Sequence, residues 1–493
     1  MIRLSAMQVR LIWLLIILIY VGLVVFSAWS GPSLQQDDHW YLNDLRTFIQ
    51  AGRMQTNQIF PAMIANDSYA PPVVLHNLPL MYLVLPFAIL LGVYWGWIAA
   101  NIVFTLLSCL ILVRLAKRFQ AVVWQQLALG AMYLFWPVTV HLSAHPLAEA
   151  GSVFFLLLLG YFWLLAPSGY PRQLLLGFLA AILVLNRPSY LLLTLLLAIL
   201  TLFGRDGKLL RRIGYTAVFL LTAGLVKSIG NMLMPQIDLS IFEAIKLPFG
   251  QTMQHFFALQ PLPFSIPEFL HKQLLTLQIQ MTGRNLSQAV FVLLFDLLLI
   301  CFLFSGRRAA HSKELYLFVG MNVLVYAATL ICFQYQTRFL QTLLPILLLW
   351  FILQHGRTGR SAKYQTAILV FCVISLAGSF LSGYQNRKDA RLARQIEQSY
   401  RQIERTYPSK EAMLVNGNSK LIPYVFTKNS AILMFDDEVN TSSELLWMRN
   451  RVPYQWLICQ TASTALDSLS TLQPRLVTTF PPPMSEWGLY QLE

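Results

Sequence analysis

Charged residues are scarce in this chain of 493 residues, because Asp, Glu, Lys and Arg make up only 12% of it whereas hydrophobic residues make up 56%. Soluble domains carry about 25% charged residues. The composition therefore excludes an ordinary soluble enzyme and indicates a polytopic membrane protein. The net charge of +14 does not indicate a nucleic-acid partner, since the basic residues lie in short runs between apolar segments.

Cysteine is also scarce, with five residues in the whole chain. Cys109, Cys301, Cys332 and Cys372 lie in apolar segments, and Cys459 alone lies in the polar C-terminal part. This distribution gives no basis for a disulfide framework or for a cysteine-based metal site.

Long apolar runs are abundant. A helix needs about 20 apolar residues to cross a bilayer core of about 30 Å. Eleven runs approach that length and predict spanning helices, at 11–29, 96–114, 122–140, 147–166, 173–187, 188–204, 211–234, 287–305, 315–333, 340–354 and 364–383. We expect the first to be an uncleaved helix and not a signal peptide, because its apolar core is long and many further runs follow.

A twelfth run, 78–91, contains Pro79 and Pro86 and would extend only about 21 Å as a helix. If it does not span, the N-terminus and four basic loops share one side of the membrane, which the positive-inside rule assigns to the cytoplasm. The loops are Arg114/Lys117/Arg118, Arg205/Lys208/Arg211/Arg212, Arg307/Arg308/Lys313 and Arg357/Arg360/Lys363. The sequence thus favours eleven spans, a re-entrant or juxtamembrane helix at 78–91, and a cytoplasmic N-terminus.

Two external loops, 30–95 and 235–286, then face outward, as does the C-terminal part. We divide the chain into a transmembrane module, 1–384, and a small extracytoplasmic α/β domain, 385–493. In this domain we expect a charged helix at 386–406 and short strands at 412–415, 431–435, 456–459, 476–480 and 487–492. The acidic run 436–438 follows a strand and is interpreted as a turn in preference to a metal site.

Asp37 and Asp38 directly follow the first span, at the outer membrane surface in this topology. External carboxylates are often merely solvated, but the aromatic-rich amphipathic run that follows favours a chemical role. Arg187, Lys227 and Arg338 lie at or near outer helix ends. Such cations snorkel to headgroups, pair with an internal carboxylate, or face a substrate. Their common side of the membrane favours an anion site, and Arg is suited to gripping phosphate.

The first external segment resembles that of the GT-C superfamily of integral-membrane glycosyltransferases, in the branch that contains the lipid A aminoarabinose transferases and protein O-mannosyltransferases. That family has an acidic pair, a Tyr four residues after the first acid, an Arg at nine and a Gly at fifteen. The matching residues in this sequence are Asp37, Asp38, Tyr41, Arg46 and Gly52.

Three later stretches extend the resemblance over roughly 30–350. The stretch from His76 to Tyr82 is similar to the family's His/Glu-x-Pro-Leu-Tyr sequence. The second external loop of the family often has an acid before a proline, whereas this chain departs with His145 before the proline and Glu149 one helical turn later. Arg338, followed by Phe339 and later by a proline, resembles the family's Arg-Tyr/Phe…Pro helix.

The resemblance implies a GT-C-like fold and an inverting transfer of a monosaccharide from a polyprenyl-phosphate-linked donor to an extracytoplasmic glycan, lipid or protein acceptor. Asp37 would act as the base, next to Asp38, and Arg187, Lys227 and Arg338 would bind the departing phosphate. The candidate substrate-binding residues are Tyr41, Arg46, His76, Tyr82, His145 and Glu149. No cofactor is expected, and a divalent metal is not favoured because the acids are few. The protein would be a multi-pass protein of a bacterial inner or plasma membrane.

Three other interpretations remain open at this point. A glycan polymerase or ligase with a diphosphate-linked donor would depend on the arginines more than on Asp37. A lipid or glycan transporter or flippase should show internal repeats and broken helices with charges at the membrane midplane. A pseudoenzyme would keep the fold for assembly alone.

Overall fold

The computed structural model describes residues 5–32, 36–51, 58–59, 79–187, 189–204, 208–233, 286–305, 313–332, 337–356, 362–406, 412–416, 432–435, 454–463, 473–482 and 484–492, together with the single residues 267, 271 and 466. For some of these, among them 36–40 and 337–340, only the backbone is described. Almost all of the predicted external segment 235–286 and the acidic run 436–438 lie outside the described residues.

The described part is mostly helical, and a helix coincides with every apolar run of the sequence. The helices are α1 (Ala6–Ala28), α2 (Gln36–Ala51), α4 (Leu80–Leu91), α5 (Val93–Arg118), α6 (Val123–Leu134), α7 (Pro137–Ser143), α8 (Glu149–Leu165), α9 (Tyr170–Asn186), α10 (Tyr190–Phe203), α11 (Leu209–Leu233), α15 (Leu286–Ser305), α16 (Lys313–Cys332), α17 (Thr337–Gly356) and α18 (Ala362–Thr406). Within the described residues, four helices are long and apolar enough to cross a membrane: α1, α5, Leu209–Gly230 of α11 and Gln365–Thr406 of α18. Shorter apolar helices pack among them.

The run 122–140, which the sequence analysis treated as one helix, is broken into α6 and α7. Proline disfavours a helical conformation in the residue before it, and Trp136 is accordingly extended, with φ −62° and ψ 127°. Pro137 then occupies the first turn of α7, where its missing N–H is not needed. After the break, α7 and the following turn, 144–148, form a buried element of the bundle.

The helices α4 and α5 form a hairpin with a single residue, Gly92, between them. Its φ of +80° lies in the left-handed region that favours glycine. Four residues on, Gly96 brings α5 into backbone contact with α4, because a Cβ added there would lie 2.4 Å from the Cα of Ala88. Small residues permit this kind of close helix approach in membrane proteins.

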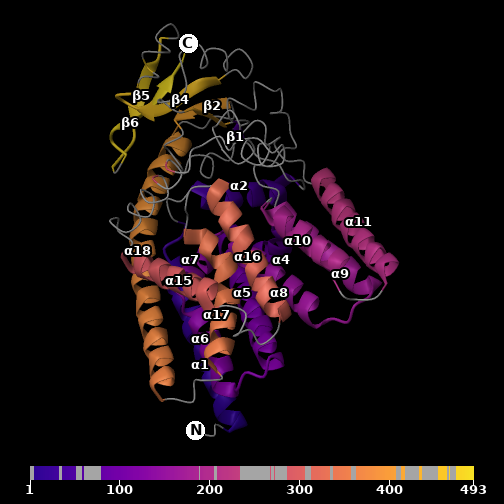
Figure 1. Ribbon diagram of the computed structural model, residues 1–493. Coiled ribbons are helices and arrows are strands. Elements are labelled where there is room, and N and C mark those ends of the chain that lie inside the picture. The colour runs from indigo at the N-terminus through magenta and orange to yellow at the C-terminus, as the bar shows by residue number, and fades with distance from the viewer. Residues whose placement is uncertain are drawn as a thin grey trace.

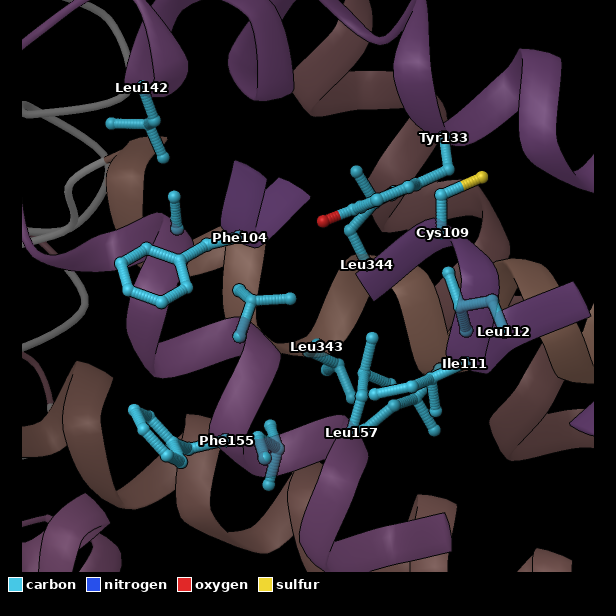
Figure 2. Close-up of a cluster of buried hydrophobic side chains, with 14 of the residues drawn as sticks. Phe104, Cys109, Ile111, Leu112, Tyr133, Leu142, Phe155, Leu157, Leu343 and Leu344 are labelled. Carbon is cyan, nitrogen blue, oxygen red and sulfur yellow. The ribbon is translucent and has the colours of Figure 1, made fainter. Parts of the chain in front are cut away.

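The interior of the bundle is apolar, as Figure 2 shows for a cluster from α5, α6, α7, α8 and α17. Tyr133 of α6 is buried together with Cys109 of α5 and Leu344 of α17, although α17 is distant from the other two helices in the sequence. Since lipid is as apolar as leucine, burial of this kind stabilises the bundle through packing more than through the hydrophobic effect.

The helix α18 is continuous over 45 residues, about 68 Å at 1.5 Å per residue. The sequence analysis separated an apolar run ending at 383 from a charged helix starting at 386, with a domain boundary at 384/385. The structure joins the two, and Figure 1 shows α18 running along the bundle to the sheet. The two chain termini lie at opposite ends of the molecule.

A six-stranded sheet of order β1-β3-β2-β4-β6-β5 lies at the far end of α18. Its strands are β1 (Gln58–Ile59), β2 (Ala412–Asn416), β3 (Ile432–Phe435), β4 (Tyr454–Gln460), β5 (Arg475–Thr479) and β6 (Trp487–Gln491). The first four in spatial order are parallel, and β6 joins β4 and β5 antiparallel. All five predicted strands are confirmed. The sixth, β1, comes from the first external segment.

Candidate functional site

The predicted acidic pair lies in the first turn of α2, directly after the residue that begins the helix. Negative side chains are favourable at this position, because the helix dipole and the unpaired N–H groups present positive charge there. In Figure 1, α2 lies at the end of the bundle that faces the sheet. The side chains of Asp37 and Asp38 lie outside the described residues.

Aromatic stacking fixes α2 to the α4–α5 hairpin. Tyr41 stacks on Trp97 of α5 with ring centroids 5.6 Å apart, and Phe48 meets Tyr82 of α4 edge-to-face at 5.5 Å. Tyr41 and Tyr82, both singled out from the sequence, therefore hold the helix in place. Arg46, also on α2, is half-buried. Residues four apart share a helix face, so position 37 lies on the same face of α2 as Tyr41.

Trp97 links this helix to the turn before α8. Its indole N–H donates a hydrogen bond of 3.1 Å to the carbonyl of Leu147. Asn101, one turn further along α5, donates from its amide to the carbonyl of His145 at 2.7 Å. The turn 144–148 is thus held by two side chains of α5, and His145 is buried within it.

The ring of His145 lies against that of His141, with centroids 4.3 Å apart. Nδ1 of His141 is 3.1 Å from the amide nitrogen of Asn386 in α18. The same amide donates to the hydroxyl of Ser27 at 2.9 Å. Three helices, α1, α7 and α18, therefore meet beside the turn that carries His145.

The first residue of α8, Glu149, forms an ion pair with Arg187, which caps the C-terminal end of α9. The Glu149 carboxylate is 1% exposed and the Arg187 side chain is 18% exposed. A buried charge is strongly destabilising without a partner. The charges of Glu149 and Arg187 compensate each other, which allows Glu149 to be buried and Arg187 to be half-buried. Pairing with an internal carboxylate was one of the alternatives that the sequence left open for Arg187.

Arg187 also lines a small, open pocket. Every other wall residue except Val325 carries a hydroxyl group: Ser189, Tyr190, Tyr326, Thr329 and Thr342. The pocket joins the starts of α10 and α17 to α16. One guanidinium among hydroxyl groups is suited to an oxyanion, because all of these groups can donate hydrogen bonds to it.

The other two candidate cations lie on α17 and α11. Arg338 precedes Thr342 by one turn of α17, although its side chain lies outside the described residues. Lys227 is exposed on α11. Three residues later, Gly230 of that helix lies so close to Leu185 of α9 that an added Cβ would be 2.5 Å from its Cδ1. Lys227 and Arg187 thus belong to the same end of two adjacent helices.

Several expectations lie outside the described residues, including the position of His76. Within the described residues, no group of three or more His, Cys, Asp or Glu side chains is arranged to hold a metal ion.

The structure adds residues that the sequence analysis missed. Trp97 and Asn101 form the links to the 144–148 turn, and Asp44 is fully buried on α2, one turn beyond Tyr41. A polar side chain within an apolar run was the available signal for Asn101. Asp44, seven residues after Asp37, stands at the spacing that returns to the same helix face.

No family model matches this chain, and no curated protein sequence does either. Solved structures match over nearly the whole chain. ArnT from Cupriavidus metallidurans, bound to undecaprenyl phosphate, has a TM-score of 0.60 at 14% identity, with 97% of each chain covered. The apo oligosaccharyltransferase from Archaeoglobus fulgidus has a TM-score of 0.58 at 9% identity, with 92% of this chain and 70% of that chain covered.

A third match is the archaeal oligosaccharyltransferase AglB from Archaeoglobus fulgidus in complex with an inhibitory peptide and a dolichol-phosphate. Its TM-score is 0.52 at 11% identity, with 92% of this chain and 69% of that chain covered. At such low identities the likeness concerns the fold. The chain has the fold of the GT-C glycosyltransferases, as the sequence resemblance predicted.

Proposed function

We propose that this chain is a membrane glycosyltransferase that moves a monosaccharide, with inversion, from a polyprenyl-phosphate-linked donor to an acceptor outside the cytoplasm. The observation that carries the proposal is the pocket at Arg187, which lies beside hydroxyl groups in a GT-C fold. Two of the structural neighbours were solved with polyprenyl-type lipid phosphates, undecaprenyl phosphate and dolichol-phosphate.

Transfer from a lipid phosphate needs a cation where negative charge develops on the leaving group. Arg187 would supply it, with Arg338 one turn before the pocket residue Thr342 and Lys227 at the same end of the adjacent helix α11. The guanidinium forms an ion pair with Glu149. A bound phosphate would compete with that carboxylate for the fork of Arg187, and this competition would favour release of the lipid phosphate after transfer.

Transfer also needs a base within hydrogen-bond reach of the acceptor. Asp37 would be that base, with Asp38 beside it, because both lie in the first turn of α2 at the sheet-facing end of the bundle. The contact of Tyr41 with Trp97, and the bond from Trp97 to the 144–148 turn, support a site that extends from α2 to the Glu149–Arg187 pair.

The topology that goes with this function has eleven spans, α4 as a re-entrant or juxtamembrane helix, a cytoplasmic N-terminus and an extracytoplasmic sheet. The position of the termini at opposite ends of the molecule supports it. The acceptor would be a glycan, lipid or protein that reaches the site from outside. We propose no cofactor and no catalytic metal.

Binding of the lipid phosphate is the direct test, because it needs no knowledge of the sugar. The thermal unfolding midpoint of the purified protein in detergent should rise with undecaprenyl phosphate, since a ligand that binds only the folded state stabilises it. Undecaprenol, which lacks the phosphate, is the matched control. Equal stabilisation by both lipids, with no transfer from any polyprenyl-phosphate sugar tested, would reject the proposal. Stabilisation by a diphosphate-linked lipid alone would favour a polymerase or ligase.

A further inference from the structure

The segment between α1 and α2 contacts α18 at Ser30 and Gly31. Arg394 of α18 donates a hydrogen bond of 2.8 Å from Nη2 to the carbonyl of Ser30. The next residue, Gly31, has φ of +95°, and a Cβ added there would lie 3.7 Å from the same nitrogen. A carbonyl bonded to a guanidinium is a stronger attachment than one bonded to a neutral donor.

Three further contacts join the end of α1 to α18 just below this point. The ring of Phe26 stacks on Phe380 at 5.1 Å, and the guanidinium carbon of Arg387 lies 4.7 Å from the centroid of the same ring. Asn386 donates to the hydroxyl of Ser27. The direction in which the chain leaves α1 toward Asp37 is therefore set by side chains of α18.

The same external segment is attached a second time, after α2. The two residues of β1 pair in parallel with β3, with Gln58 opposite Ile432 and Ile59 opposite Leu433. A strand this short has little stability of its own, so its conformation depends on the sheet. The part of the chain that carries the acidic pair thus lies between two attachments to the C-terminal part.

The two attachments belong to one packed unit, because the end of α18 forms the core beneath the sheet. Tyr400 is fully buried and meets Phe480 edge-to-face at 4.9 Å. Ser399 of the same helix lies within hydrogen-bond distance, 3.3 Å, of the carbonyls of Pro481 and Pro482. The helix and the sheet should therefore move together.

We propose that α18 and its sheet act as a clamp on the first external segment, and that Arg394 is a positioning residue for α2. The clamp is defined as the part of α18 from Asn386 onward together with strands β2 to β6. The clamp proposal rests on the proposed function in one respect, namely that Asp37 is the group that the clamp positions. The C-terminal part then has a function in catalysis without contributing a group that touches the substrate.

Hydrogen–deuterium exchange of the full-length protein in detergent tests the clamp without any measurement of activity. Arg394→Met removes the bond to Ser30 and keeps an unbranched side chain. We expect the amides of α2 to exchange roughly tenfold to hundredfold faster, the range for loss of one hydrogen bond to a charged group. Arg405→Met is the matched control, since Arg405 is an exposed cation about three turns further along the same helix. Arg394→Lys, which keeps a charged donor, should restore part of the protection.

Unchanged exchange of α2 in Arg394→Met, or equal acceleration in Arg405→Met, would overturn the clamp. Where transfer can be measured, Arg394→Met should lower kcat and leave the donor KM unchanged, because the phosphate pocket is elsewhere. Faster exchange of the α2 amides in Arg394→Met, together with no sugar transfer by the wild-type protein, would leave the clamp in place and reject the proposed function. Unchanged exchange of the α2 amides in Arg394→Met, together with sugar transfer by the wild-type protein, would overturn the clamp and leave the proposed function in place.

Discussion

Arg187 and Glu149 lie 38 residues apart in the chain, yet their side chains form an ion pair between the end of α9 and the start of α8. The carboxylate is almost completely buried, whereas the guanidinium also faces the hydroxyl-lined pocket. The pair is neutral as a whole. An anion in the pocket therefore meets a cation that already has a partner. The affinity for the anion depends on whether Arg187 can hydrogen-bond to the anion and to Glu149 at the same time.

The first prediction separates the structural role of Arg187 from its role in binding. Arg187→Met leaves Glu149 buried without its cation, and loss of one partner of a buried pair costs about 3–5 kcal/mol. The unfolding midpoint in detergent should therefore fall clearly. Adding Glu149→Gln removes the uncompensated charge and should restore most of the lost stability.

Undecaprenyl phosphate should fail to stabilise the double variant, although that variant is folded. Glu149→Gln alone should bind the lipid phosphate at least as tightly as the wild type, because the competing carboxylate is gone. Normal lipid-phosphate binding by the double variant would show that Arg187 serves only the structure, and would leave the phosphate partner to be found elsewhere.

The second prediction concerns the α4–α5 hairpin. Gly96→Ala places a Cβ 2.4 Å from backbone atoms of Ala88, which cannot move aside as a flexible side chain can. We expect a destabilisation of roughly 1–3 kcal/mol from overpacking, measured as a lower unfolding midpoint. Gly224→Ala on α11 is the control, since nothing lies within 4 Å of the added atom. A midpoint equal to that of the control would mean that the two helices are not in backbone contact.

The helices could be predicted from the sequence because a segment that crosses a bilayer must satisfy its own backbone hydrogen bonds. Each long apolar run is accordingly helical, and each run except 122–140 forms a single helix. The two errors have local causes. Pro137 interrupts the run 122–140, a signal that was present but outweighed by hydropathy. The change from apolar to charged residues near 385 was taken as a break between two helices, whereas α18 contains no proline and is one continuous helix.

The five C-terminal strands were predictable from apolar runs between polar stretches, but β1 was not. Two residues carry no alternation that a pattern could detect, and β1 exists because β3 offers an edge. The site was predictable in part for the same reason. Individual residues such as Tyr41 and Arg187 stand out by type and position, whereas their partners Trp97 and Glu149 are chosen by the tertiary fold.

The third prediction concerns topology. Eleven spans from a cytoplasmic N-terminus leave the C-terminal sheet outside, so alkaline phosphatase fused after Glu493 should be active and a reporter that works only in the cytoplasm should not. Both fusions are compared in cells at equal expression. The opposite pattern would mean that α4 spans the membrane and that the four basic loops lie outside.

The last prediction concerns the base. Asp37→Asn keeps the shape of the side chain and removes the proton acceptor, so transfer should fall by roughly 10²–10⁴-fold. Binding of undecaprenyl phosphate should be retained, because the pocket at Arg187 is formed by other helices. Asp38→Asn should have a smaller effect if that residue only orients its neighbour. The matched control is Asp389→Asn, an exposed aspartate on α18. Turnover near the wild-type value in purified Asp37→Asn would remove Asp37 from the mechanism, and the buried carboxylate of Asp44 on the same helix would become the next candidate.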